Sequence, residues 1–167
     1  VVLGSCFANN IGDKLAYYKF RALQNPFGVL FHPLAIENLI SRAIQEESYT
    51  GEEVFFLNER WQCYDAHSDL SSVAIEDLLG SLNSGLSKTK LYINKASHIF
   101  ITLGTAWTYQ LKESGKEVAN CHKVPQLAFK KELLSIEKIV QSLEAIVHQI
   151  QTINTKTQIV FTVSPVR

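Results

Sequence analysis

The sequence of 167 residues contains no methionine, only three cysteines, and no excess of either charge. Sixteen Lys and Arg residues balance sixteen Asp and Glu residues, so no net basic charge points to nucleic acid or an anionic membrane. No apolar run reaches the roughly 18 residues of a transmembrane helix. No secretory signal is visible. These absences favour a cytoplasmic protein that has neither nucleic acid nor a membrane as its partner.

The cysteines are widely spaced, at Cys6, Cys63 and Cys121. An odd number without a regular framework argues against a disulfide-stapled secreted domain. There is no CxxC pair, and the spacing of Cys6, Cys121 and His122 is not that of a metal site. We therefore expect neither a metal nor a cofactor.

The apolar content of 46% is enough for one sizeable core, and the length fits a single domain over residues 1–167. The chain opens on Val1-Val2-Leu3, which reads as the tail of a strand. It closes on Ser164–Arg167, directly after another strand. We expect a fragment of a longer domain that is truncated at its C-terminal side.

Hydrophobic periodicity predicts strands that alternate with helices. The expected strands are 1–3, 20–24, 98–103 and 158–163, with hairpins at 53–57/61–65 and 107–112/116–120. The expected helices are 9–18, one that starts at Pro33, one from the capping residues 69–72 to Leu82, a short one that ends at Lys95 after a loop at 83–87, and one capped by Ser135. This order implies an α/β fold with a parallel sheet and helices on both faces.

In such sheets the ligand site lies beyond the carboxyl ends of the strands. Gly4-Ser5-Cys6-Phe7 follows the first strand and opens a helix. A helix N-terminus favours the thiolate form of a cysteine, and its N–H groups can hold an oxyanion. Cys6 is therefore a candidate nucleophile; the alternative is a tight turn with an inert cysteine.

Three further segments follow strands at this edge. Asn25-Pro26-Phe27-Gly28 can offer an amide side chain and a backbone N–H, and Gly104-Thr105 has the same character. The alternative for both is a plain turn. Arg167 can bind an anionic substrate group, or it is merely exposed at the end of the last strand.

Among the histidines, His122 is the one best placed to meet Cys6. It lies in Asn120-Cys121-His122-Lys123, which the second hairpin returns to the same edge. A Cys6/His122 pair would suit nucleophilic catalysis. The topology does not fix the position of His67, and His32 flanks the start of a helix near this edge.

The segment Gly4-Ser5-Cys6-Phe7-Ala8 resembles the signature of the GSCFA-domain family. Other blocks of this kind lie along the chain: Asn25–Val29, Thr102–Trp107, Asn120–Lys123 and Phe161–Arg167. That family is regarded as distantly similar to the SGNH/GDSL hydrolases. The resemblance implies a three-layer α/β/α, flavodoxin-like fold of the SGNH-hydrolase type.

The hydrolase pattern Gly-Asp-Ser-Leu falls on Gly4–Phe7, which puts the nucleophile at Cys6, with Ser5 as the fallback. The resemblance also implies that Gly28 donates to the oxyanion. The hydrolases' Gly-x-Asn block falls on Gly104-Thr105-Ala106, where the chain departs from the pattern because alanine has no side-chain amide. Topology offers Asn120 as its substitute.

The hydrolases' late Asp-x-x-His block has no equivalent before Arg167. The general base is then His122 or a histidine beyond the end of the sequence. The leading expectation is an acyl-ester hydrolase or acyltransferase that acts on a small-molecule or carbohydrate-linked acyl group. Its substrate-binding candidates are Asn25, His67 and Arg167. The alternatives are a non-catalytic binding module on the same scaffold and a redox protein with a reversible Cys6–Cys121 disulfide.

Overall fold

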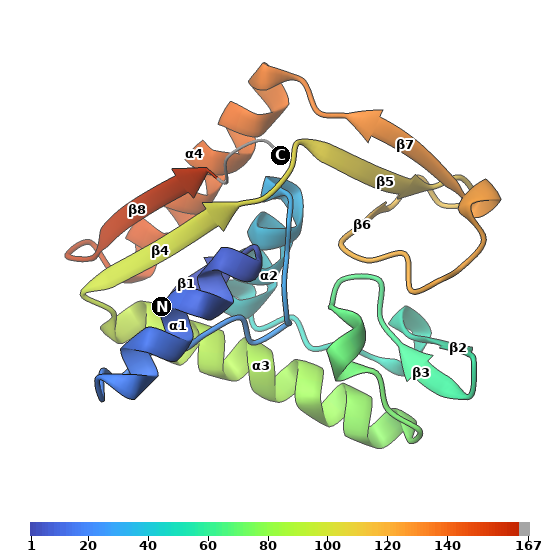
Figure 1. The fold of residues 1–167 in the computed structure, drawn as a ribbon, viewed down its shortest axis with the longest axis horizontal. Helices are drawn as coiled ribbons and strands as arrows, with labels where there is room; N and C mark the ends of the chain where they lie inside the picture. The colour runs from blue at the N-terminus through green and yellow to red at the C-terminus, as the bar shows by residue number, and fades with distance from the viewer. Residues whose placement is uncertain (164–167) are drawn as a thin grey trace.

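A three-stranded parallel sheet organises the computed structural model, which describes residues 1–163 (Figure 1). Strand β4 (His98–Leu103) lies between β1 (Val2–Gly4) and β8 (Gln158–Val163). Gly4 stands beside Thr102 in the register, and β8 pairs with β4 over its full length. The expected α/β fold with a parallel sheet is confirmed.

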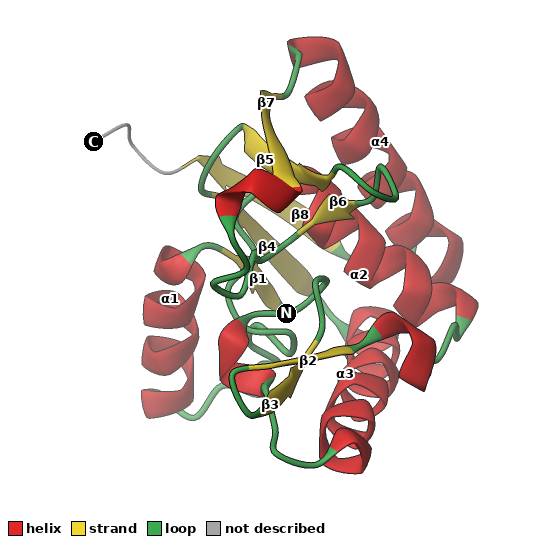
Figure 2. Ribbon diagram, turned by 90° about the vertical axis from the view of Figure 1, so that its right-hand side faces the viewer, coloured by secondary structure: helices red, strands yellow, loops and turns green. Residues whose placement is uncertain are grey.

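Four helices flank this sheet in the described residues: α1 (Cys6–Tyr17), α2 (Pro33–Gln45), α3 (Ile75–Lys95) and α4 (Ile136–Ile153). Figure 2 shows α1 on one side of the sheet and the other three helices grouped on the opposite side. The main core lies on that second side. It consists of fully buried sheet and helix residues, among them Leu3, Ile99, Ile101, Ile36, Leu39, Ile40, Leu82, Ile93, Ile146 and Ile150.

Two small antiparallel units extend the molecule, and both predicted hairpins are confirmed. The first pairs β2 (Phe55–Leu57) with β3 (Arg60–Gln62). Asn58 and Glu59 between them both have positive φ, the backbone of a two-residue hairpin turn. The second has the order β6 (Glu117–Val118), β5 (Trp107–Leu111), β7 (Phe129–Leu133).

The predicted strand at 20–24 is wrong. Only Gln24 makes a bridge, to Val2 of β1. Backbone hydrogen bonds from Val2 N to Leu23 O (2.8 Å) and from Asn25 N to Val2 O (3.0 Å) flank this single contact. The Gln24 side chain instead binds α1, where it donates to Asn9 O at 3.1 Å. The apolar residues before it therefore stay outside the sheet.

The predicted loop at 83–87 is also wrong, because α3 runs without a break from Ile75 to Lys95. Its buried stripe continues through this segment at Leu82 and Leu86. Gly85 lies against Phe27, and a Cβ there would come within 2.9 Å of Phe27 Cε2. This glycine permits close packing and does not end the helix. The predicted capping residues 69–72 overlap a separate 3₁₀ turn at Ser68–Leu70.

His32 caps α2 and ties it to β6. Its Nδ1 accepts from Ala35 N at 3.2 Å, and its Nε2 lies 3.0 Å from Val118 O. A carbonyl only accepts, so the proton of the neutral ring is on Nε2. The ring is buried, and burial lowers the pKa of His32. Protonation would place a second N–H against the backbone N–H of Ala35.

Acid is therefore expected to destabilise the fold. The folded chain resists a proton that unfolded His32 accepts, so stability is complete above the ordinary histidine pKa of about 6.5 and falls below it. Burial also lowers the pKa of His122, which acts in the same direction. Urea unfolding at about pH 7.5 and about pH 5.5 measures this loss.

The variant His32→Asn separates this effect from general acid sensitivity. Asparagine can accept from Ala35 N but does not titrate, so the variant should be less stable at neutral pH and less sensitive to acid. His148→Asn, on an exposed part of α4, is the matched control and should keep the wild-type pH dependence. An unchanged pH dependence in His32→Asn would contradict the assignment.

Candidate functional site

Three loops meet beyond the carboxyl ends of β1 and β4: residues 4–7, 25–31 and 104–105. The structure thus brings together three of the segments that the sequence placed at this edge. Backbone hydrogen bonds join them: Leu30 N donates to Gly4 O (3.0 Å), and Gly104 N (2.8 Å) and Thr105 N (3.1 Å) both donate to Phe31 O. Ser5 N donates to Thr102 O of β4 at 3.0 Å.

The two candidate nucleophiles differ sharply in exposure. Ser5 is the N-cap of α1 and is only 2% exposed. Its Cβ lies 3.0 Å from where a Cβ on Gly104 would be. Cys6 is the first residue of α1 and is exposed. Of the two, Cys6 is the side chain that a substrate can reach.

Asn25 has a positioning role in this edge. Its Oδ1 accepts from Gly4 N at 2.8 Å, and its Nδ2 donates to Asn9 Oδ1 at 2.6 Å. The amide thus joins the turn at 25–28 to the β1–α1 connection. The side chain is used to hold the edge together, and substrate binding by Asn25 stays a prediction.

The glycine N–H groups proposed for the oxyanion are engaged within the protein. Gly28 N donates to Asn25 O at 2.8 Å, and Gly104 N donates to Phe31 O at 2.8 Å. A donor role for either would require its turn to open. The N-terminal turn of α1 offers a different source, because the first N–H groups of a helix lack partners within the helix.

His67 lies against the same turn as Gly28. Its backbone N donates to Phe27 O at 2.8 Å, and a Cβ on Gly28 would overlap the Cβ of His67. The imidazole is partly exposed, with Nδ1 3.0 Å from Asp69 Oδ2. A proton shared between these two atoms leaves the lone pair of Nε2 able to accept another proton. Asp69 is a candidate site residue that the sequence reasoning missed.

His122 is buried beside this pair and faces other partners. Its Nε2 donates to Cys63 O at 2.7 Å, and its Nδ1 lies 3.5 Å from Ser68 Oγ. Its backbone N donates to Asn120 Oδ1 at 2.9 Å. Within residues 1–163 no hydrogen bond joins His122 to Cys6, and the catalytic roles expected for His122 and Asn120 stay predictions.

The other two cysteines are poor nucleophiles at neutral pH. Burial raises the pKa of Cys63 to about 12 and also raises the pKa of Cys121. All three cysteines are free thiols, and a reversible Cys6–Cys121 disulfide stays a prediction. Exposure thus singles out Cys6 among the thiols.

The described part of the chain contains no group of three or more His, Cys, Asp or Glu side chains that could hold a metal ion. None of its helices combines the length and apolarity needed to cross a bilayer. Arg167 lies outside the described residues, so its predicted role has no structural counterpart.

Comparison with known proteins gives a match to one family. The model of the GSCFA family matches residues 1–167. Neither a curated protein nor a solved structure matches the chain. The match extends over every block that the sequence reasoning singled out, and the chain belongs to the GSCFA family.

Proposed function

We propose that this chain is an SGNH-like acyl-ester hydrolase or acyltransferase with Cys6 as its nucleophile. The observation that carries the proposal is the exposed Cys6 thiol at the first position of α1, directly beyond β1. A helix N-terminus stabilises both a thiolate and a developing oxyanion. Helix α1 lies on one side of the sheet and the other three helices lie on the opposite side (Figure 2). This placement supports a three-layer arrangement of the SGNH-hydrolase type.

The geometry favours His67 as the general base, with Asp69 as the carboxylate beside its ring. Leu30 N donates to Gly4 O, and His67 N donates to Phe27 O, so Gly4 and His67 both contact the loop at 25–31. His122 is less suited to the role because Cys63 O and Ser68 Oγ face its two ring nitrogens. Asp69 orients the His67 ring and stabilises the imidazolium that forms.

The reaction then has two steps. Cys6 Sγ gives its proton to His67 and attacks the acyl carbonyl carbon. The ester C–O bond breaks, the leaving alcohol takes the proton from His67, and a thioester remains on Cys6. Water or an acceptor alcohol then gives its proton to His67 and attacks the thioester carbonyl carbon. The C–S bond breaks, the acyl group leaves as a carboxylic acid or a new ester, and Cys6 Sγ takes the proton back from His67. The expected substrates are small-molecule or carbohydrate-linked acyl esters.

Acylation by p-nitrophenyl acetate tests this proposal. We expect one acetyl group on Cys6, located by mass spectrometry of peptides after an acid quench. The variant Cys6→Ala should lose this adduct. Cys121→Ala is the control: it removes a different thiol, whose pKa is raised by burial, and it should keep the adduct on Cys6. An adduct on Ser5 would move the nucleophile by one residue.

The rival is a non-catalytic binding module. It is favoured by one observation: the N–H groups of Gly28 and Gly104 donate to backbone carbonyls and are not held open for an oxyanion. A wild-type protein that forms no adduct with the activated ester would support this reading over the enzyme.

A further inference from the structure

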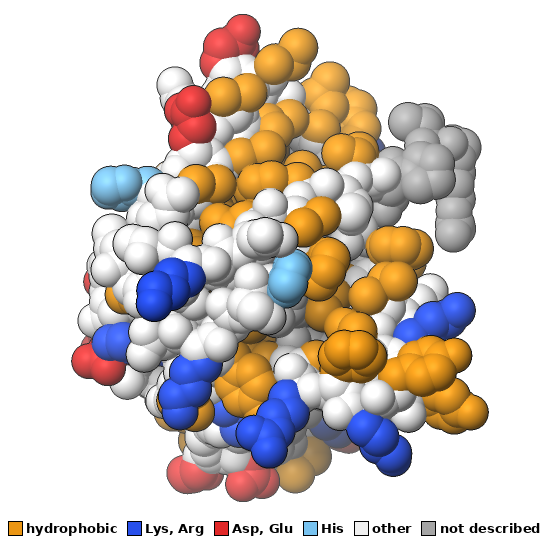
Figure 3. All heavy atoms as spheres, turned by 90° about the vertical axis from the view of Figure 1, so that its left-hand side faces the viewer, with side chains coloured by type: hydrophobic (Ala, Val, Ile, Leu, Met, Phe, Trp, Pro, Cys, Tyr) orange, Lys and Arg blue, Asp and Glu red, His pale blue; other side chains and the backbone are white. Residues whose placement is uncertain are grey.

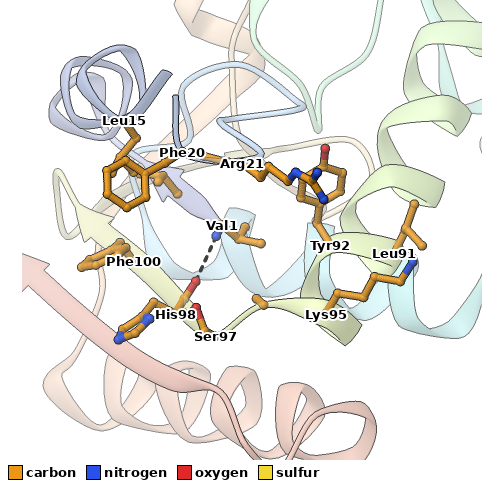
Figure 4. Close-up of a pocket in the computed structure, with 13 residues that line it drawn as sticks. Val1, Leu15, Phe20, Arg21, Leu91, Tyr92, Lys95, Ser97, His98 and Phe100 are labelled. Atoms are coloured by element: carbon orange, nitrogen blue, oxygen red, sulfur yellow. Dashed lines mark hydrogen bonds between the residues drawn. The ribbon is translucent and has the colours of Figure 1, made fainter. Parts of the chain in front are cut away.

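A cavity of about 750 Å³ lies at the opposite end of the sheet from Cys6. It is bounded by the amino ends of β1 and β4, by α1, by residues 20–22 and by the last turns of α3 (Figure 4). Its volume falls within the range of roughly 300–1,000 Å³ of small-molecule sites. Cys6, His67 and Asp69 are not among its lining residues.

Most of the cavity wall is apolar. Figure 4 shows the rings of Phe20 and Phe100 on one side, with Leu15 beside Phe20. Tyr92 and Leu91 of α3 stand on the other side. Phe20 is 64% exposed, so a ligand that covered its ring would remove apolar surface from water. The wall therefore suits an apolar body.

The charge of the cavity has one sign. Arg21 and Lys95 line it, and none of the described residues that line it is acidic. Neither side chain takes part in an ion pair within residues 1–163. Basic and apolar side chains also stand close together on this end of the molecule in Figure 3. An anionic head would therefore meet positive charge and no carboxylate in this part of the chain.

The C-terminus of α3 lies beside the cavity, and its dipole would by itself disfavour an anion. Two of its carbonyl groups are already satisfied. Asn154 Nδ2 donates to Ile93 O at 2.8 Å and to Ala96 O at 2.9 Å. Lys95 stands in the last turn of the helix and offsets the remaining partial charge.

We propose that this cavity binds a small amphipathic anion, with an apolar body between Phe20, Phe100 and Tyr92 and a carboxylate at Arg21 and Lys95. The proposal is independent of catalysis at Cys6. A medium-chain carboxylate has both parts of this chemistry, and decanoate is a suitable probe.

Titration of the protein with decanoate, followed by ¹H–¹⁵N NMR, tests the site. We expect saturable shifts at the amides of Ala22, Ser97 and His98. Decanol, which has the same chain without the charge, should bind more weakly. Arg21→Gln and Lys95→Gln should each weaken decanoate binding by about threefold, and the double variant by about tenfold, as expected for partly exposed ion pairs.

Lys88→Gln is the matched control, because Lys88 is an exposed lysine of the same helix that does not line the cavity. It should leave decanoate affinity unchanged, as should Cys6→Ala. Tyr92→Ala should weaken decanoate and decanol alike. The proposal is overturned if decanol binds as tightly as decanoate, if the shifts do not saturate, or if Lys88→Gln weakens binding as much as Lys95→Gln.

Discussion

Replacing Gly4 with alanine is expected to destabilise the fold by about 3 kcal/mol or more. Gly4 has a φ of 122°, a backbone angle that residues other than glycine rarely adopt. A Cβ at this position would overlap Thr102 O of the neighbouring strand β4. Because the obstacle is backbone, β1 would have to move away from β4.

The same movement would disturb the candidate site. Ser5 N donates to Thr102 O and Leu30 N donates to Gly4 O, so both bonds depend on the position of β1. We therefore expect Gly4→Ala to lose stability and the acylation of Cys6 together. Urea unfolding followed by circular dichroism measures the first effect, and the p-nitrophenyl acetate reaction measures the second.

Gly80→Ala is the matched control, with the opposite sign. Gly80 lies in α3, and an added Cβ would meet nothing within 4 Å. Alanine should stabilise the helix by up to about 1 kcal/mol. A Gly4→Ala protein that fails to fold is the extreme form of the expected result. A Gly4→Ala protein as stable as the wild type would show that β1 does not pair with β4 in this way.

Elements with a strong local signal could be predicted from the sequence. The apolar run at 98–103 became the central strand, and Ser135, whose Oγ accepts from Lys138 N at 3.2 Å, caps α4 as expected. Strand β7 (Phe129–Leu133) had no such signal. Only Phe129 is buried in it, so its side chains show no alternation.

The candidate site likewise contains residues that local sequence signals place and residues that only tertiary contacts place. The place of Cys6 follows from a strand, a turn and a helix within a few residues, and such local geometry can be read from a sequence. The place of His67 depends on a bond to Phe27 O, formed across 40 positions of the chain. The burial of His122 depends on Cys63 O, a contact that no local pattern indicates. Tertiary contacts thus decide where each of these histidines lies.

The variant His67→Asn is expected to slow the acylation of Cys6 by about 10²–10⁴-fold, the usual contribution of a general base. Position 67 is the N-cap of the 3₁₀ turn Ser68–Leu70, and asparagine is a favoured N-cap residue, so the local turn should persist. Asp69→Asn should also slow acylation, because it removes the group that orients the ring, but by less than loss of the base itself. The measurement is the rate of p-nitrophenol release in the first turnover.

A purely structural role for His67 would give a different pattern. Loss of a base also removes its inflection from the pH profile of the acylation rate, whereas a damaged turn lowers the rate at every pH. His148→Asn, an exposed substitution on α4, should change neither the rate nor the profile. If His67→Asn keeps the wild-type inflection, the base lies elsewhere. The adduct on Cys6 is located by mass spectrometry, independently of the rate. That result would therefore keep the assignment of Cys6 as nucleophile and reject only the assignment of His67 and Asp69.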